Sequence, residues 1–123
     1  MKTNRILVID DNINATRVAR LILERTGHYA VRELNDPGQA LDIAREFEPD
    51  LILLDVCMPD IEGSAVAEKI NGTSEFADTP IVFLTAYAYQ DDIQKGLESG
   101  AQAYLTKPFD FDVLEQTIEQ FVL

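Results

Sequence analysis

The sequence has few of the residues on which disulfide-linked and zinc-binding proteins depend. Of its 123 residues one is cysteine, Cys57, one is histidine, His28, and none is tryptophan. A single cysteine excludes an internal disulfide and is typical of proteins kept in the reducing cytosol. One cysteine and one histidine are also too few for a structural zinc site.

Basic residues are scarce as well, because 10 Lys and Arg face 22 Asp and Glu and leave a net charge of −12. Such a charge disfavours direct binding of nucleic acid or of anionic membrane, and it favours cations and basic protein surfaces as partners. No apolar run approaches the roughly 20 residues of a membrane span. The four apolar residues that follow Arg5 are too few for a signal peptide. We therefore expect a cytoplasmic domain.

Short apolar runs are what the sequence does contain. Three of them are continuous rather than alternating, which is typical of strands buried on both faces of a parallel sheet. These runs are Ile6–Ile9, Leu51–Leu54 and Ile81–Leu84, and weaker runs occur at Tyr29–Leu34 and Ala103–Leu105.

Helical patterns separate the runs. In the first helix, Ala15, Val18, Ala19 and Ile22 have the spacing of one apolar face. The second is predicted to begin at Asp36-Pro37, a capping residue followed by proline at the first helical position. The others are predicted over residues 63–70 and 87–99 and from Asp110, the last with a stripe of Phe111, Leu114, Ile118, Phe121 and Val122.

This alternation of strands and helices predicts one α/β domain over residues 1–123, a doubly wound (βα)5 fold with a five-stranded parallel sheet. We expect no appended output domain.

Polar residues follow four of the five predicted strands. Asp10 and Asp11 follow the run Ile6–Ile9, Asp55 follows Leu51–Leu54, and Thr85 follows Ile81–Leu84. The weaker run Ala103–Leu105 is followed by Thr106, Lys107 and Pro108. Ligand sites in doubly wound sheets form at the carboxyl ends of the strands, so these side chains are predicted to share one crevice.

The chemistry of this group points to phosphoryl transfer. Three carboxylates so close together repel one another, and a divalent cation such as Mg²⁺ removes the repulsion. Together with an ammonium and a hydroxyl, the cation would stabilise a transferring phosphoryl group, with Asp55 as nucleophile. The alternative for Asp10 and Asp11 is that they merely cap the helix that follows.

Four segments together make the sequence resemble the receiver domain of two-component response regulators. They are Val8–Asn12, Pro49–Pro59 with Gly63, Pro80–Ala86, and Gly100-Ala101 through Tyr104–Phe109. The resemblance covers the whole chain and implies the strand order 2-1-3-4-5.

The resemblance also implies roles for individual residues. Asp55 would accept a phosphoryl group from the phosphohistidine of a sensor histidine kinase or a phosphotransfer protein. Mg²⁺, or Mn²⁺ in its place, would be held directly by Asp11, Asp55 and the backbone carbonyl of Cys57, with Asp10 acting largely through water. Thr85 and Lys107 would hold phosphoryl oxygens.

Further implied roles concern the signal and the rim of the site. Thr85 and Tyr104 would relay phosphorylation to the face of the fourth helix, fifth strand and fifth helix, where a downstream protein binds. The Lys107-Pro108 peptide bond would be cis, and Met58, Ala86 and Tyr87 would flank the site. Arg17, Arg20 and Arg25 form a solvated helix face, or they steer the docking of the kinase.

Two other functions use similar folds. A phosphohydrolase of the haloacid-dehalogenase type also has a strand-end aspartate and Mg²⁺, but it needs a second aspartate where this chain has Cys57. A flavodoxin-like redox module needs a Ser/Thr/Gly-rich loop after the first strand, and the two aspartates there would repel the flavin phosphate. The sequence therefore favours a switch over a turnover enzyme.

Overall fold

Strands and helices alternate along the chain in the computed structural model, which describes residues 3–55, 63–85, 103–106 and 111–122. The strands are β1 (Asn4–Ile9), β2 (Tyr29–Leu34), β3 (Leu51–Asp55), β4 (Ile81–Thr85) and β5 (Ala103–Thr106). The helices are α1 (Ile13–Arg25), α2 (Ala40–Phe47), α3 (Gly63–Asn71) and α5 (Phe111–Phe121), with short 3₁₀ turns at Pro37–Gln39 and Ser74–Phe76. The helix predicted over residues 87–99 lies outside the described residues.

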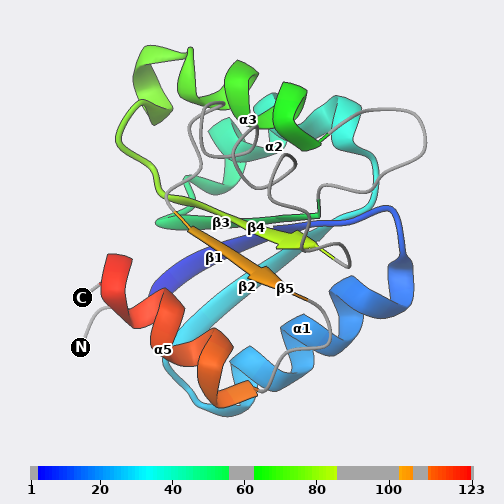
Figure 1. Ribbon diagram of the computed structural model, residues 1–123, viewed down its shortest axis with the longest axis vertical. Coiled ribbons are helices and arrows are strands. Elements are labelled where there is room, and N and C mark those ends of the chain that lie inside the picture. The colour runs from blue at the N-terminus through cyan, green and yellow to red at the C-terminus, as the bar shows by residue number, and fades with distance from the viewer. Residues whose placement is uncertain (1–2, 56–62, 86–102, 107–110, 123) are drawn as a thin grey trace.

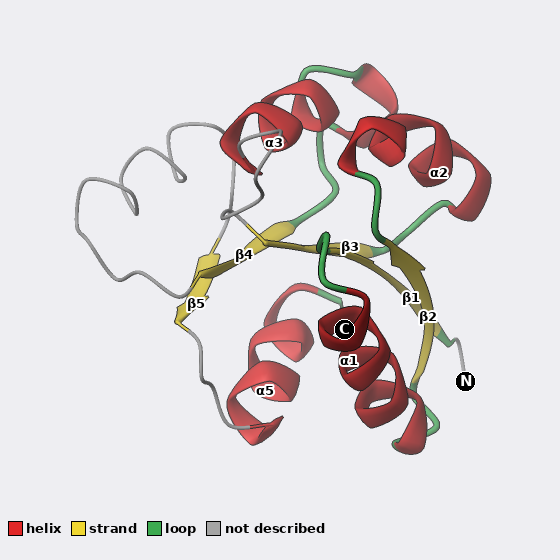
Figure 2. Ribbon diagram, turned by 90° about the vertical axis from the view of Figure 1, so that its right-hand side faces the viewer, coloured by secondary structure: helices red, strands yellow, loops and turns green. Residues whose placement is uncertain are grey.

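The five strands form one parallel sheet in the order β2-β1-β3-β4-β5 (Figure 1). Helices α1 and α5 cover one face of the sheet, and α2 and α3 cover the other (Figure 2). The predicted doubly wound fold and its strand order are therefore confirmed. In this order β1 and β3 are neighbours at the centre of the sheet, a position that decides where the polar residues after them meet.

Both faces of the central strands are buried, which explains their continuous apolar runs. Leu7, Ile9, Ile52 and Leu54 pack into the core beneath α2 and α3. Ile6, Val8, Leu51 and Leu53 pack into a second core against α1 and α5. All eight are at most 1% exposed, so each residue of these strands contributes to one core or the other.

The buried face of α1 differs from the predicted stripe. Val18 is 53% exposed, whereas Thr16 and Leu23 are fully buried, and Ala19 packs against the same core as Leu23. The prediction is confirmed for Ala19 and wrong for Val18, because the buried face of the helix is turned to include Leu23 and a polar residue, Thr16. The hydroxyl of Thr16 is hydrogen bonded to Glu33 and Asn35, which allows a polar residue to occupy a core position.

Local hydrogen bonds set the helix ends. The Asn12 side chain caps α1 by accepting from the backbone N–H groups of Asn14 and Ala15. Asp36 accepts from the N–H of Gly38, as expected of a cap, but the turn that it opens is 3₁₀ and α2 begins only at Ala40. The predicted cap at Asp110 lies outside the described residues.

Candidate functional site

The sheet register brings Asp10 and Asp55 together. Ile9 is the last residue of β1 and pairs with Leu54 of β3, so the residues that follow each of them are level at the carboxyl edge of the sheet. Asp55 is the last residue of β3, and Asp10 begins the turn into α1. The side-by-side position of β1 and β3 thus places two carboxylates where a ligand site forms in such folds.

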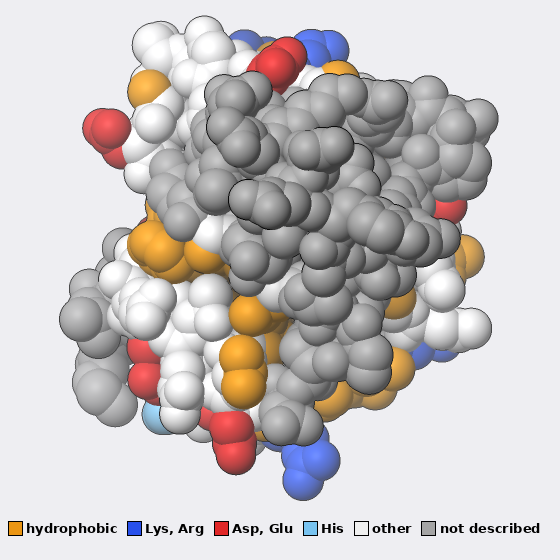
Figure 3. All heavy atoms as spheres, viewed as in Figure 1, with side chains coloured by type: hydrophobic (Ala, Val, Ile, Leu, Met, Phe, Trp, Pro, Cys, Tyr) orange, Lys and Arg blue, Asp and Glu red, His pale blue; other side chains and the backbone are white. Residues whose placement is uncertain are grey.

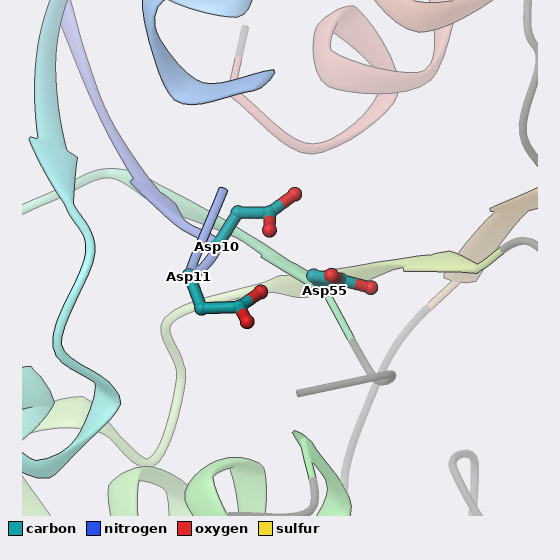
Figure 4. A group of neighbouring side chains, drawn as sticks. All are labelled: Asp10, Asp11 and Asp55. Carbon is teal, nitrogen blue, oxygen red and sulfur yellow. The ribbon is translucent and has the colours of Figure 1, made fainter. Parts of the chain in front are cut away.

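Asp11 completes a cluster of three carboxylates. Oxygen atoms of Asp10, Asp11 and Asp55 all lie within 4.8 Å of one another, and the three side chains extend from the two strand ends toward a common space (Figure 4). Asp10 and Asp55 are 2% and 6% exposed, while Asp11 is exposed. The cluster is therefore a partly buried concentration of negative charge with one side open to solvent.

Several hydrogen bonds hold Asp10 in place. Its backbone N–H donates to the carbonyl of Leu34 over 3.1 Å, and its carbonyl accepts from Nδ2 of Asn35 over 2.9 Å. Its carboxylate Oδ1 accepts from the backbone N–H of Asn12 over 3.0 Å. Because Asn12 is itself the cap of α1, the alternative in which Asp10 and Asp11 serve merely as that cap loses its support.

The donor set of this cluster fits a hard divalent cation. Among the described residues it offers carboxylate oxygens only, the ligands that Mg²⁺ and Mn²⁺ prefer, and Asp11 is exposed to solvent. Bringing in two positive charges would also relieve the mutual repulsion of the carboxylates.

The strand ends beside this cluster carry the predicted hydroxyl. Asp55 pairs with Leu84 in the register of β3 and β4, so Thr85 lies one residue beyond that pair at the same edge of the sheet. Thr85 pairs with Thr106 at the end of β5. Tyr104 is in β5 and pairs with Phe83. The side chains of Thr85 and Tyr104 are outside the described part of the structure, as are residues Cys57, Met58, Ala86, Tyr87, Lys107 and Pro108.

Sequence reasoning missed Asn35, which binds the backbone of Asp10. Asn35 directly follows β2, so it lies at the same carboxyl edge of the sheet as the three aspartates. Extending the rule of strand-end polar residues to the weaker second run would have found it.

Comparisons with known proteins agree with this geometry. The response regulator receiver domain family matches residues 6–119.

The chain belongs to this family. It is 30% identical over 117 residues to the polar-differentiation response regulator DivK of Brucella anthropi, covering 95% of this chain and 94% of DivK. It is 37% identical over 108 residues to the DNA-binding dual master transcriptional regulator RpaA of a Synechocystis species, covering 88% of this chain but 44% of RpaA.

Solved receiver structures have the same fold. The chemotaxis protein CheY4 of Vibrio cholerae superposes with a TM-score of 0.91 at 30% identity, covering 99% of this chain and all of CheY4. A response regulator from Chloroflexus aurantiacus gives a TM-score of 0.91 at 28% identity, with 98% of each chain covered. The chain is thus a receiver domain of two-component signalling, a switch controlled by phosphorylation.

The described helices of this receiver are unlike membrane spans. Among residues 3–55, 63–85, 103–106 and 111–122, none forms a helix of the length and apolar character needed to cross a bilayer.

Proposed function

We propose that Asp55 is the phosphoacceptor of this receiver and that Asp10, Asp11 and Asp55 hold the Mg²⁺ on which phosphorylation depends. One observation carries the proposal: the three carboxylates lie within 4.8 Å of one another at the carboxyl edge of the sheet. Of the three, Asp55 alone is a residue of a central strand, which makes it the most rigidly placed nucleophile.

The proposed reaction is transfer of a phosphoryl group from a phosphohistidine. A carboxylate oxygen of Asp55 attacks the phosphorus, the new O–P bond forms, and the P–N bond to the histidine breaks. The histidine nitrogen then takes a proton from solvent. Mg²⁺ held by the three carboxylates would neutralise negative charge on the phosphoryl oxygens. The rest of the catalysis is positioning, because Asp10 and Asp55 are held by the paired strands β1 and β3.

Further residues complete the proposal. Thr85 and Lys107 hold phosphoryl oxygens, the carbonyl of Cys57 contributes to the metal site, and Thr85 with Tyr104 passes the change to a downstream protein. The position of Thr85 at the end of β4, next in the sheet to Asp55, supports its part. The whole chain, residues 1–123, acts as one receiver whose output is protein binding.

We infer that the phosphodonor protein docks on α1. Val18 and Leu21 are 53% and 52% exposed on this helix, and Arg17 and Arg25 are exposed on it in a chain of net charge −12. Ile22 and Arg25 also line a groove against Phe111 of α5. Hydrophobic side chains reach the surface over this layer of the molecule (Figure 3). An apolar surface with cationic residues suits an acidic, amphipathic helical partner.

A phosphohydrolase of the haloacid-dehalogenase type is the competing function. It requires a general acid two residues after the nucleophile, and that position is Cys57 here. We therefore propose stoichiometric phosphorylation rather than turnover of phosphoesters, and steady release of phosphate from p-nitrophenyl phosphate would contradict this.

Reduction with borohydride tests which residue is phosphorylated. Borohydride converts an aspartyl phosphate to homoserine, which peptide mass spectrometry locates in the sequence. After incubation with acetyl phosphate and Mg²⁺, homoserine is expected at Asp55 and at no other aspartate. Homoserine at Asp10 or Asp11 instead would overturn the assignment of the nucleophile.

A further inference from the structure

A chain of hydrogen bonds runs from the surface of α1 to the acidic cluster. Nη1 of Arg20 lies 3.0 Å from Oε2 of Glu33, and the other carboxylate oxygen of Glu33 lies 2.9 Å from the Thr16 hydroxyl. That hydroxyl is 2.9 Å from Nδ2 of Asn35, which also binds the Asp10 carbonyl over 2.9 Å. The middle of this hydrogen-bond network is shielded from water, because Thr16 is fully buried and the Glu33 side chain is 16% exposed.

The chemistry of each group fixes the direction of these bonds. Glu33 is a carboxylate and accepts from both Arg20 and Thr16. The Thr16 hydroxyl has one hydrogen and two acceptors in reach, the Glu33 carboxylate at 2.9 Å and the Ile13 carbonyl at 3.1 Å. The hydrogen is best used on the nearer, charged acceptor, so the hydroxyl oxygen accepts from Asn35. The Asn35 amide then has both hydrogens engaged, one on Thr16 and one on the Asp10 carbonyl. Turning the amide over would place its oxygen against both of these acceptors, so the Thr16 hydroxyl and the Asp10 carbonyl together fix the orientation of Asn35.

The orientation of Asn35 bears on the metal site through Asp10. Asp10 lies one residue beyond the end of β1. The bond from Asn35 to its carbonyl and the bond from the Asn12 N–H to its Oδ1 help to place its carboxylate. We propose that Asn35 and Thr16 are positioning residues that set the affinity of the acidic cluster for a divalent cation. This inference rests on the proposed metal site and adds two residues that touch neither metal nor phosphate.

Binding of Mn²⁺ to the purified protein tests the inference. Free Mn²⁺ is measured by its electron paramagnetic resonance signal, without a phosphodonor. Thr16→Val removes the hydroxyl but keeps the shape, and the dissociation constant for Mn²⁺ is expected to rise about tenfold, as for other outer residues of metal sites. Thr16→Ser restores the hydroxyl and is expected to restore the affinity.

Thr117→Val is the matched control. Thr117 is on α5, where its hydroxyl donates to the carbonyl of Val113 over 2.8 Å, so the same change is made in a helix outside the network. Its affinity for Mn²⁺ is expected to equal that of the wild type. If Thr16→Ser or Thr117→Val loses as much affinity for Mn²⁺ as Thr16→Val does, the role of the Thr16 hydroxyl is overturned.

A second variant keeps the test decisive if Thr16→Val does not fold, which circular dichroism reports. Asn35 is only partly buried, and Asn35→Ala removes its amide directly; a folded Asn35→Ala with wild-type affinity would overturn the inference. If folded Thr16→Val binds Mn²⁺ as tightly as the wild type does, the inference is overturned as well, but the proposed metal site still stands. A wild-type protein that binds no Mn²⁺ would instead overturn the proposed metal site itself.

Discussion

Replacing Asp10 by Asn is expected to stabilise the protein in metal-free buffer, although it weakens the proposed metal site. Asp10 and Asp55 are 2% and 6% exposed, so solvent screens their repulsion poorly. Asn keeps an Oδ1 that can accept from the N–H of Asn12, as Asp10 does over 3.0 Å. The substitution therefore removes one negative charge while preserving the local hydrogen bond.

The size of the gain follows from the geometry of the cluster. Two unit charges at the 4.8 Å limit of the cluster repel by about 3.5 kcal/mol at an effective dielectric constant of about 20. Counterions and small movements of the side chains lower this value, so we expect the free energy of unfolding to rise by about 1–3 kcal/mol.

Urea unfolding followed by circular dichroism measures this change, with EDTA and with Mg²⁺. In the wild type, Mg²⁺ at tenfold its dissociation constant should raise the free energy of unfolding by about 1.4 kcal/mol. In Asp10→Asn the metal should have much less effect, so the two proteins converge in stability as Mg²⁺ is added.

Asp78→Asn is the control, because Asp78 is exposed and its replacement changes the net charge by the same amount. A gain in Asp10→Asn no larger than in Asp78→Asn would refute the idea that the cluster stores repulsion. An equal response of Asp10→Asn and wild type to Mg²⁺ would refute the role of Asp10 in the metal site.

Three other outcomes are expected. The double variant Val18→Ala/Leu21→Ala should slow phosphoryl transfer from a phosphodonor protein about tenfold but leave phosphorylation by acetyl phosphate unchanged. The control is Val113→Ala on α5, since Val113 is 42% exposed. Equal slowing by this control would contradict docking on α1. Burial, with help from Glu119 and Glu115, raises the pKa of Tyr29, so its stabilising contribution is present below about pH 10 and is lost as the pH rises through the raised value. Stability should then fall more steeply above pH 10 in the wild type than in Tyr29→Phe, by at most about 1.4 kcal/mol per pH unit, and parallel curves would disprove this. Glu48→Gly should raise the free energy of unfolding by about 1 kcal/mol, because Glu48 ends α2 with a φ of 53°, a left-handed conformation that favours glycine. An unchanged urea midpoint would show that the backbone at Glu48 is not strained.

Strong local signals made the sheet predictable. The runs Ile6–Ile9 and Leu51–Leu54 are short, continuous and ended by aspartates, a pattern that favours strands buried on both faces, and all eight residues are buried. The rule that parallel strand ends share an edge placed Asp10, Asp11 and Asp55 on one side of the sheet, and their close approach depends on β1 and β3 being neighbours. The strand order came from the family resemblance, because composition does not say which strands are neighbours.

Other features escaped prediction. Thr16 was overlooked in α1 because its burial requires Glu33 and Asn35 from the end of β2. The later start of α2 reflects the tighter turn at Pro37–Gln39, which a capping residue and a proline do not distinguish from an α-helical turn. The burial of Thr16 thus depends on groups that are distant in the sequence, whereas the start of α2 depends on local bonds that the same residues could make in either type of turn.

The central claim is that Asp55 accepts one phosphoryl group with the help of a divalent cation. The most direct test is the intact mass of the protein after incubation with acetyl phosphate, with Mg²⁺ or with EDTA, beside Asp55→Asn. We predict a single phosphoryl adduct that requires Mg²⁺ and is absent in Asp55→Asn. An adduct of the same yield in EDTA, or one that survives in Asp55→Asn, would contradict the account.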